Sequence, residues 1–187
     1  MVSRKYLVDY RLEETTGKNG RIKTTAVYIG GDFAFAQPVS RGEKWLLLSL
    51  SVLSWLAFVG ALIPVTSAAR ITYVMLPFVL SALPMYLMTG AAASLLAAND
   101  VMTRESSDKI SKRLPPGAIT TTILSGVAVI AFLVSVIVSR DSVTAGDFVF
   151  GALSLLIAFM SAFVFYKSKK LKAVRIDSGE IITRDAC

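Results

Sequence analysis

The sequence predicts an all-α membrane protein, a bundle of four transmembrane helices with a small β-hairpin or sheet formed by its N- and C-terminal segments. Apolar side chains make up 54% of the 187 residues and mean hydropathy is +0.62, which is too apolar for an ordinary soluble domain. These residues also fall into runs that match the roughly 20 helical residues needed to cross a bilayer.

The predicted spans cover residues 45–65, 71–98, 117–139 and 148–166. They divide the chain into a β-hairpin with a linker at 1–43, a transmembrane domain at 44–166 and a basic, β-like tail at 167–187. The run from Ile71 to Ala98 holds 28 residues without Asp, Glu, Lys, Arg or His. Pro77 and Pro84 lie within it, seven residues apart on nearly one helix face, and predict a kink.

The N-terminal segment predicts a β-hairpin. Residues from Tyr6 to Leu12 alternate between apolar and polar, and Asn19-Gly20 supplies turn chemistry before a return strand from Arg21 to Ile29. An isolated hairpin is marginal in water, so we expect one small sheet that adds a tail strand from Val174 to Thr183. Residues 32–42 are predicted to be a linker.

Charged residues predict the topology. Of the 20 Lys and Arg residues, eight precede the first span, four lie in the middle loop and six follow the last span, with one in each remaining turn. By the positive-inside rule both termini are cytoplasmic, and we expect a multi-pass protein of the plasma membrane. Topology explains the net charge of +7, so a nucleic-acid partner is not expected. Pro115-Pro116 is predicted to begin the third span.

The composition argues against catalysis. The chain has no His, and its one cysteine is Cys187, so His-based and Cys-based metal sites are not expected, and neither is a cofactor. Its length is similar to that of the four-span efflux subunits of the small multidrug resistance family, but their intramembrane glutamate has no counterpart here. Ion-coupled transporters commonly use such a charged group.

Small residues spaced four apart predict helix contacts, either within the bundle or with another subunit. They are Gly90, Ser94 and Ala98, then Ala118, Thr122 and Gly126, then Ser154, Ala158 and Ala162. A polar cavity, if one exists, is expected between Tyr86 and the kink at Pro84.

A basic cluster after the last span is predicted to anchor the topology and to bind anionic lipid headgroups. It consists of Lys167, Lys169, Lys170, Lys172 and Arg175.

Together these features predict a non-enzymatic accessory or scaffold subunit of a membrane complex or homo-oligomer, which presents a cytoplasmic β-module. The alternative is an uncoupled conduit for a lipid or small amphipathic solute, with the kinked second span as its moving element.

Overall fold

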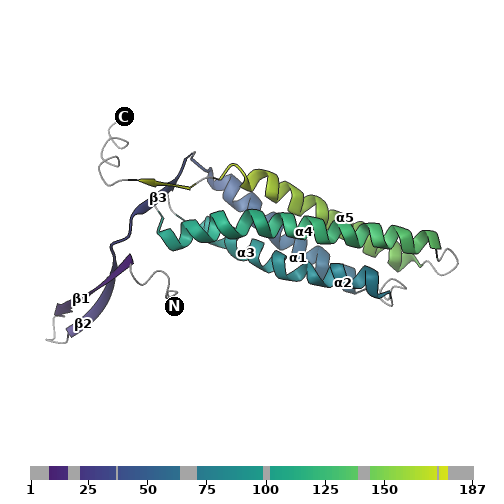
Figure 1. Ribbon diagram of the computed structural model, residues 1–187, viewed down its shortest axis with the longest axis horizontal. Coiled ribbons are helices and arrows are strands. Elements are labelled where there is room, and N and C mark those ends of the chain that lie inside the picture. The colour runs from purple at the N-terminus through teal and green to yellow at the C-terminus, as the bar shows by residue number, and fades with distance from the viewer. Residues whose placement is uncertain are drawn as a thin grey trace.

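The computed structural model describes residues 9–16, 22–36, 38–63, 71–98, 102–138, 144–171 and 173–176. The described helices are α1 (Arg41–Leu62), α2 (Thr72–Leu80), α3 (Ala82–Ala97), α4 (Arg104–Val138) and α5 (Ala145–Ser168). The strands are β1 (Tyr10–Thr16), β2 (Ile22–Tyr28), β3 (Asp32–Phe35) and β4 (Ala173–Ile176). The helices lie side by side in a long bundle, and the four strands lie at one end of it, here called the strand-bearing end (Figure 1).

Four helical segments are long and apolar enough to cross a membrane, which confirms the predicted number of spans. They are α1, α2 together with α3, α4 and α5. At most 39% of the apolar stretch of any span is buried within the chain, so each stretch leaves a large apolar surface that the chain does not cover. Large apolar side chains such as Leu83, Ile130 and Phe159 cover this outer surface, as expected for helices surrounded by lipid.

The second span is interrupted at Ser81, between its two prolines. Pro84 has no N–H to donate to the carbonyl of Leu80, so the helical ladder ends there and resumes as α3. Pro84 then occupies the first turn of α3, where a missing N–H costs little. The Ser81 hydroxyl donates to the Phe78 carbonyl oxygen at 2.6 Å and satisfies a backbone acceptor beside the break.

Pro115-Pro116 was expected at the start of the third span, but the helix that contains this span begins earlier: α4 starts at Arg104, and both prolines lie inside it. At about 1.5 Å per residue, its 35 residues extend roughly 52 Å, well beyond a hydrocarbon core of about 30 Å. The first three turns are polar and carry two ion pairs, Lys109 with Glu105 at 2.9 Å and Lys112 with Asp108 at 2.8 Å. Ile110 and Leu114 on these turns are buried in the apolar core, so this α4 extension, residues 104–114, packs against the bundle at the strand-bearing end.

The strands form two separate antiparallel sheets and not the single sheet that was expected. β1 pairs with β2, whereas β4 from the tail pairs with β3, a segment predicted to be linker. Asp32 lies opposite Ile176 and Phe35 opposite Ala173. Phe33 also forms a bridge with Met102, which ties the second sheet to the start of α4. The rest of the expected tail strand, residues 177–183, lies outside the described residues, as do residues 6–8.

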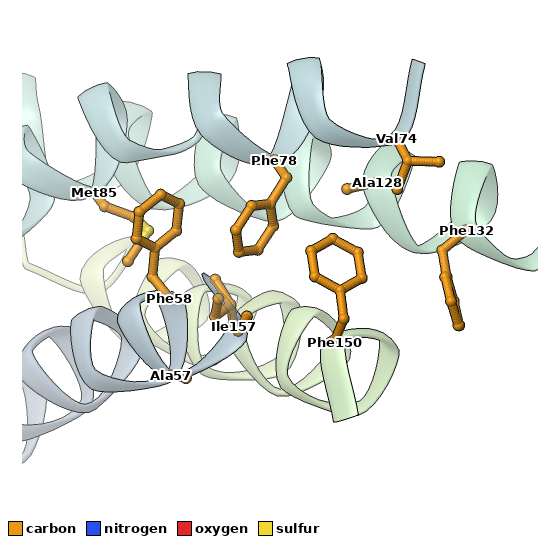
Figure 2. Packing of buried hydrophobic residues seen from close by; sticks show 10 residues of the cluster. Ala57, Phe58, Val74, Phe78, Met85, Ala128, Phe132, Phe150 and Ile157 are labelled. Atoms are coloured by element: carbon orange, nitrogen blue, oxygen red, sulfur yellow. The ribbon is translucent and has the colours of Figure 1, made fainter. Parts of the chain in front are cut away.

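Two apolar clusters hold the helices together. In the cluster distant from the strands, Phe78 stacks on Phe58 with ring centroids 4.7 Å apart and packs at 4.9 Å against Phe150 (Figure 2). Such ring contacts add about 0.5–1.5 kcal/mol each to the burial of the side chains. The cluster nearer the strands contains Leu47, Leu95 and Leu114, so the α4 extension shares the core of the bundle.

Two glycines allow the helices to approach closely. A Cβ on Gly117 of α4 would lie 3.0 Å from the Pro84 carbonyl oxygen and 3.1 Å from the Met88 nitrogen, both backbone atoms. A Cβ on Gly151 of α5 would lie 2.4 Å from Phe132 Cε1. Gly117 therefore lets α4 lie directly against the interrupted turn that begins α3.

Candidate functional site at the strand-bearing end

Basic side chains surround the end of α5 and lie over aromatic rings one turn earlier. Lys169 Nζ is 4.5 Å from the centroid of Phe165, and Lys170 Nζ is 5.3 Å from that of Tyr166. Lys167 Nζ is 6.0 Å from the Phe163 centroid. An ammonium above an aromatic face is attracted by the ring quadrupole, and this basic and aromatic pairing is typical of a helix that leaves the bilayer.

Lys167 also belongs to a small cavity between the ends of α1 and α5. It forms an ion pair with Glu43 at 3.6 Å. The cavity holds about 90 Å³, with apolar walls from Leu46, Leu47 and neighbouring residues, and Lys170 at its rim. An apolar floor beneath two ammonium groups suits the junction of a lipid headgroup and its acyl chains.

A second cavity, of about 240 Å³, lies where the hairpin, the second sheet and α4 meet. It is lined by Asp9, Gly31, Phe33, Arg104 and Arg175. Arg104 Nη1 is 3.7 Å from Asp9 Oδ1, an ion-pair separation that exceeds hydrogen-bond distance. The other carboxylate oxygen, Asp9 Oδ2, is buried and has no hydrogen-bond partner.

Gly31 makes room for one of the two guanidinium groups in this cavity. A Cβ at position 31 would lie 2.7 Å from Arg175 Nε and 3.1 Å from Arg175 Cζ. Because Gly31 carries no side chain, the Arg175 guanidinium packs against its backbone. The basic cluster predicted from the sequence is thus divided in the structure: Arg175 lines this cavity, whereas Lys167 and Lys170 line the smaller one. Lys172 lies outside the described residues.

The nine small residues expected at helix contacts differ in their surroundings. Ala118 and Ser154 are buried, Gly90 is exposed, and the other six are half-buried: Ser94, Ala98, Thr122, Gly126, Ala158 and Ala162. A Cβ on Gly90 or Gly126 would find no atom within 4 Å, so these two glycines are not required for packing within the chain. The Ala98 carbonyl oxygen accepts a 2.6 Å hydrogen bond from Lys44 Nζ, which links the ends of α3 and α1.

Most hydroxyl groups inside the bundle form hydrogen bonds with the backbone of their own helix. The hydroxyls of Thr89, Thr122 and Ser161 each donate to a backbone carbonyl four residues earlier, the usual way to satisfy such groups in lipid. Two contacts cross between helices: Trp55 Nε1 donates to Thr89 Oγ1 at 3.1 Å, and the hydroxyls of Thr122 and Ser161 lie 2.9 Å apart. Ser154 Oγ is buried without a partner.

The residues considered for a cavity at the kink do not face one another. Pro84 is buried against α4, whereas Tyr86 is 69% exposed on the outer surface. Pro77 lies inside α2. Neither of the two cavities at the strand-bearing end includes these three residues.

Sequence reasoning did not identify Asp9, Gly31 or Arg104 as neighbours. Arg104 was counted only as a topology charge, and nothing in its local sequence indicates that it meets a carboxylate 95 positions earlier. Asp9 is one of the polar positions in the alternating strand from Tyr6 to Leu12, so nothing in its local sequence distinguishes it either. Among the residues that the structure describes, no group of three or more His, Cys, Asp or Glu side chains is arranged to hold a metal ion.

At this end of the molecule, two guanidinium groups and one carboxylate line a cavity, and three lysines lie over aromatic rings at the end of α5. This arrangement is suited to binding charged groups. Comparison of the chain with protein-family models, with curated proteins and with solved structures finds no match.

Proposed function

We propose that the chain is a non-enzymatic subunit of a membrane complex, an accessory or scaffold protein whose β1–β2 hairpin binds a protein partner by strand addition. The observation that carries this proposal is the open hairpin. Among the described strands, β1 and β2 pair only with each other. Open strand edges accept a further strand, and a two-stranded hairpin is marginal in water. Leu12, which is 71% exposed, and Ile29, at 60%, add apolar surface beside these edges.

The hairpin register identifies which backbone groups are available to a partner strand. The Ile29 N–H donates to the Asp9 carbonyl oxygen at 2.8 Å, so positions 9 and 29 form a hydrogen-bonded pair. Such pairs alternate along an antiparallel ladder. Leu12 and Ala26, which lie opposite each other three positions farther along, are therefore a pair whose N–H and C=O groups point outward to the open edges.

Proline substitutions at these positions test strand addition. Leu12→Pro blocks the β1 edge and Ala26→Pro blocks the β2 edge, and each leaves the internal hairpin hydrogen bonds in place. Val27→Pro is the control that disrupts the hairpin itself. Val27 lies opposite Arg11 in a hydrogen-bonded pair, so proline there removes a hydrogen bond between β1 and β2. We expect one edge variant to lose proteins that copurify from the native membrane in gentle detergent. A strictly monomeric chain with no copurifying protein, or full retention in all three variants, would contradict strand addition.

The spans are proposed to contact another subunit through the exposed face of α3 around Gly90 and Ser94. Gly90 is exposed and has open space around it, which would allow a neighbouring helix to approach closely. Gly90→Ile should then dissociate homo-oligomers or remove a partner in native mass spectrometry. An unchanged subunit composition would remove this face from the proposed interface.

Lys167, Lys169 and Lys170 are proposed to bind anionic lipid headgroups, each contributing about 1 kcal/mol near the membrane surface. Their positions above aromatic rings and beside the small cavity at Glu43 support this role. Replacing all three with glutamine should reduce the anionic lipid retained through purification. Equal retention would assign these lysines to topology alone.

The strand-bearing end is proposed to be cytoplasmic and the membrane to be the plasma membrane. The charge bias of the sequence supports this orientation. In a Cys187→Ser background, a cysteine at Ala145 should be labelled from outside intact cells by a membrane-impermeant maleimide, while a cysteine at Lys112 is protected. The reverse labelling pattern would invert the topology.

The interruption at Ser81 supports a second candidate function, a conduit for a lipid or small amphipathic solute that uses the second span as a moving element. Pro77→Ala together with Pro84→Ala should straighten that span and change flux in liposomes. The same flux in the variant, or none in the wild type, would remove this candidate.

A further inference from the structure

The cavity at the junction of the hairpin, the second sheet and α4 combines charged groups of both signs. Arg104 and Arg175 provide two guanidinium groups, and Asp9 provides one carboxylate. These three residues come from the base of the hairpin, the start of α4 and β4, so the fold brings them together from distant parts of the chain. The surrounding volume of about 240 Å³ is open space beside all three side chains.

The carboxylate is incompletely satisfied. The Asp9 side chain is 13% exposed, its Oδ1 is 3.7 Å from the Arg104 guanidinium, and its Oδ2 is buried without a partner. A buried oxygen without a donor is costly, and an ionised carboxylate can only accept hydrogen bonds. A molecule in the cavity can approach Asp9 only over the exposed part of its side chain, where an ammonium group would be attracted by the carboxylate charge.

The two guanidinium groups favour an oxyanion. Guanidinium pairs well with phosphate because its N–H groups form a planar fork that matches two phosphate oxygens. Among the described residues that line the cavity, two arginines and one carboxylate give a summed positive charge, which favours a phosphate. Phe33 closes one side with an apolar wall and limits the room for a large polar ligand.

We propose that this cavity binds an amino-phosphate group, with the phosphate held by Arg104 and Arg175 and the ammonium held by Asp9. The volume lies below the range of about 300–1,000 Å³ typical of sites for drug-sized molecules, so the ligand is the size of a small headgroup. Phosphoethanolamine has this chemistry, either as a free metabolite or as the headgroup of phosphatidylethanolamine. Because Asp9 begins the hairpin and Arg104 begins α4, the bound ligand links the β-module to the bundle.

The test uses the full chain in phosphatidylcholine nanodiscs and measures the affinity of O-phosphoethanolamine by calorimetry, with methyl phosphate as the probe that lacks an ammonium. We expect Arg104→Gln and Arg175→Gln each to weaken O-phosphoethanolamine binding by about tenfold or more, the usual effect of losing a charged hydrogen bond. Arg113→Gln is the matched control, since it removes the same charge from an exposed position of α4 outside the cavity. Asp9→Ala should abolish the preference for O-phosphoethanolamine over methyl phosphate.

A variant that changes no charged residue tests whether weaker binding can occur without a loss of folding. In Gly31→Ala the new methyl group displaces the Arg175 guanidinium, a flexible group that can move without disturbing the backbone. This variant should stay folded and still bind more weakly. The headgroup source is tested by native mass spectrometry in mixed nanodiscs, where phosphatidylethanolamine retained by the wild type should be lost from Arg104→Gln and Gly31→Ala.

Either source supports the proposal, because the two arms share the same contacts. Binding of the soluble probe identifies a free metabolite, and selective retention of the lipid identifies a headgroup. Absence of binding in both arms overturns the proposal. So does equal binding by the wild type, Arg104→Gln, Arg175→Gln and Gly31→Ala, or no preference for the ammonium-bearing probe in the wild type.

Discussion

Replacing Gly117 with alanine would place a methyl carbon 3.0 Å from the Pro84 carbonyl oxygen and 3.1 Å from the Met88 nitrogen. Both atoms belong to the backbone of α3, so neither can rotate away as a side chain would. α4 must instead shift away from the first turns of α3. Gly126 lies on the same helix, but a Cβ there meets no atom within 4 Å, so Gly126→Ala makes the same chemical change without a collision.

Both substitutions gain the same stability from replacing glycine in a helix, but only Gly117→Ala also causes a steric clash. Glycine to alanine in a helix stabilises the fold by about 0.5–1 kcal/mol, because alanine loses less backbone entropy. Overpacking a close contact costs about 1–3 kcal/mol. We therefore expect Gly126→Ala to raise the free energy of unfolding by up to about 1 kcal/mol, and Gly117→Ala to fall about 1–3 kcal/mol below Gly126→Ala.

Unfolding by SDS in mixed micelles, followed by the fluorescence of Trp55 in a Trp45→Phe background, measures both free energies. An excess of micelles keeps at most one chain in each, so contacts between chains do not contribute. If the two variants prove equally stable, the close approach of α4 to the start of α3 is not present in solution, and the reasoning from the glycine contacts fails.

Three further substitutions test other parts of the structure. Gly151→Ala should lower the free energy of unfolding by about 1–3 kcal/mol, because its methyl group meets the Phe132 ring, and adding Phe132→Leu should restore most of the loss. Thr89→Val should cost about 0.5–1.5 kcal/mol and shift the emission of Trp55, because its Nε1 loses an acceptor inside the bundle. Asp147→Ala removes the capping box at the start of α5 and should cost about 1 kcal/mol in the same SDS titration; no change there would mean that the cap contributes nothing.

The helical spans were predictable because they depend on local composition. A long apolar run without charge has only one stable conformation in lipid, and no tertiary contact is needed to recognise it. The missing N–H of a proline is also a local property, so an interruption near Pro84 could be expected. The close approach of α4 to the first turns of α3 through Gly117 is a contact between distant segments, which spacing alone does not reveal.

The β-structure and the cavity depend on contacts between distant segments, and here the sequence was less informative. Alternation identified strand-forming stretches but did not determine that, among the described strands, the tail strand β4 pairs with β3 and not with the hairpin. Pro115-Pro116 resembled a helix start, yet α4 continues through both prolines into a polar extension whose ion pairs support it. The neighbourhood of Asp9 and Arg104 follows from these pairings, so it could not be predicted before them.

The pairing of β3 with β4 has a consequence for biosynthesis. β3 leaves the ribosome before any span has been made, whereas β4 follows the last span, so the second sheet cannot form until all four spans have been synthesised. Until then Phe33 and Phe35, which pack against the core near the strands, have no partner strand. A chain that stops short, or whose last span fails to insert, keeps these two rings accessible to chaperones and proteases. The second sheet thus marks a chain whose synthesis has passed the last span and whose two ends have met.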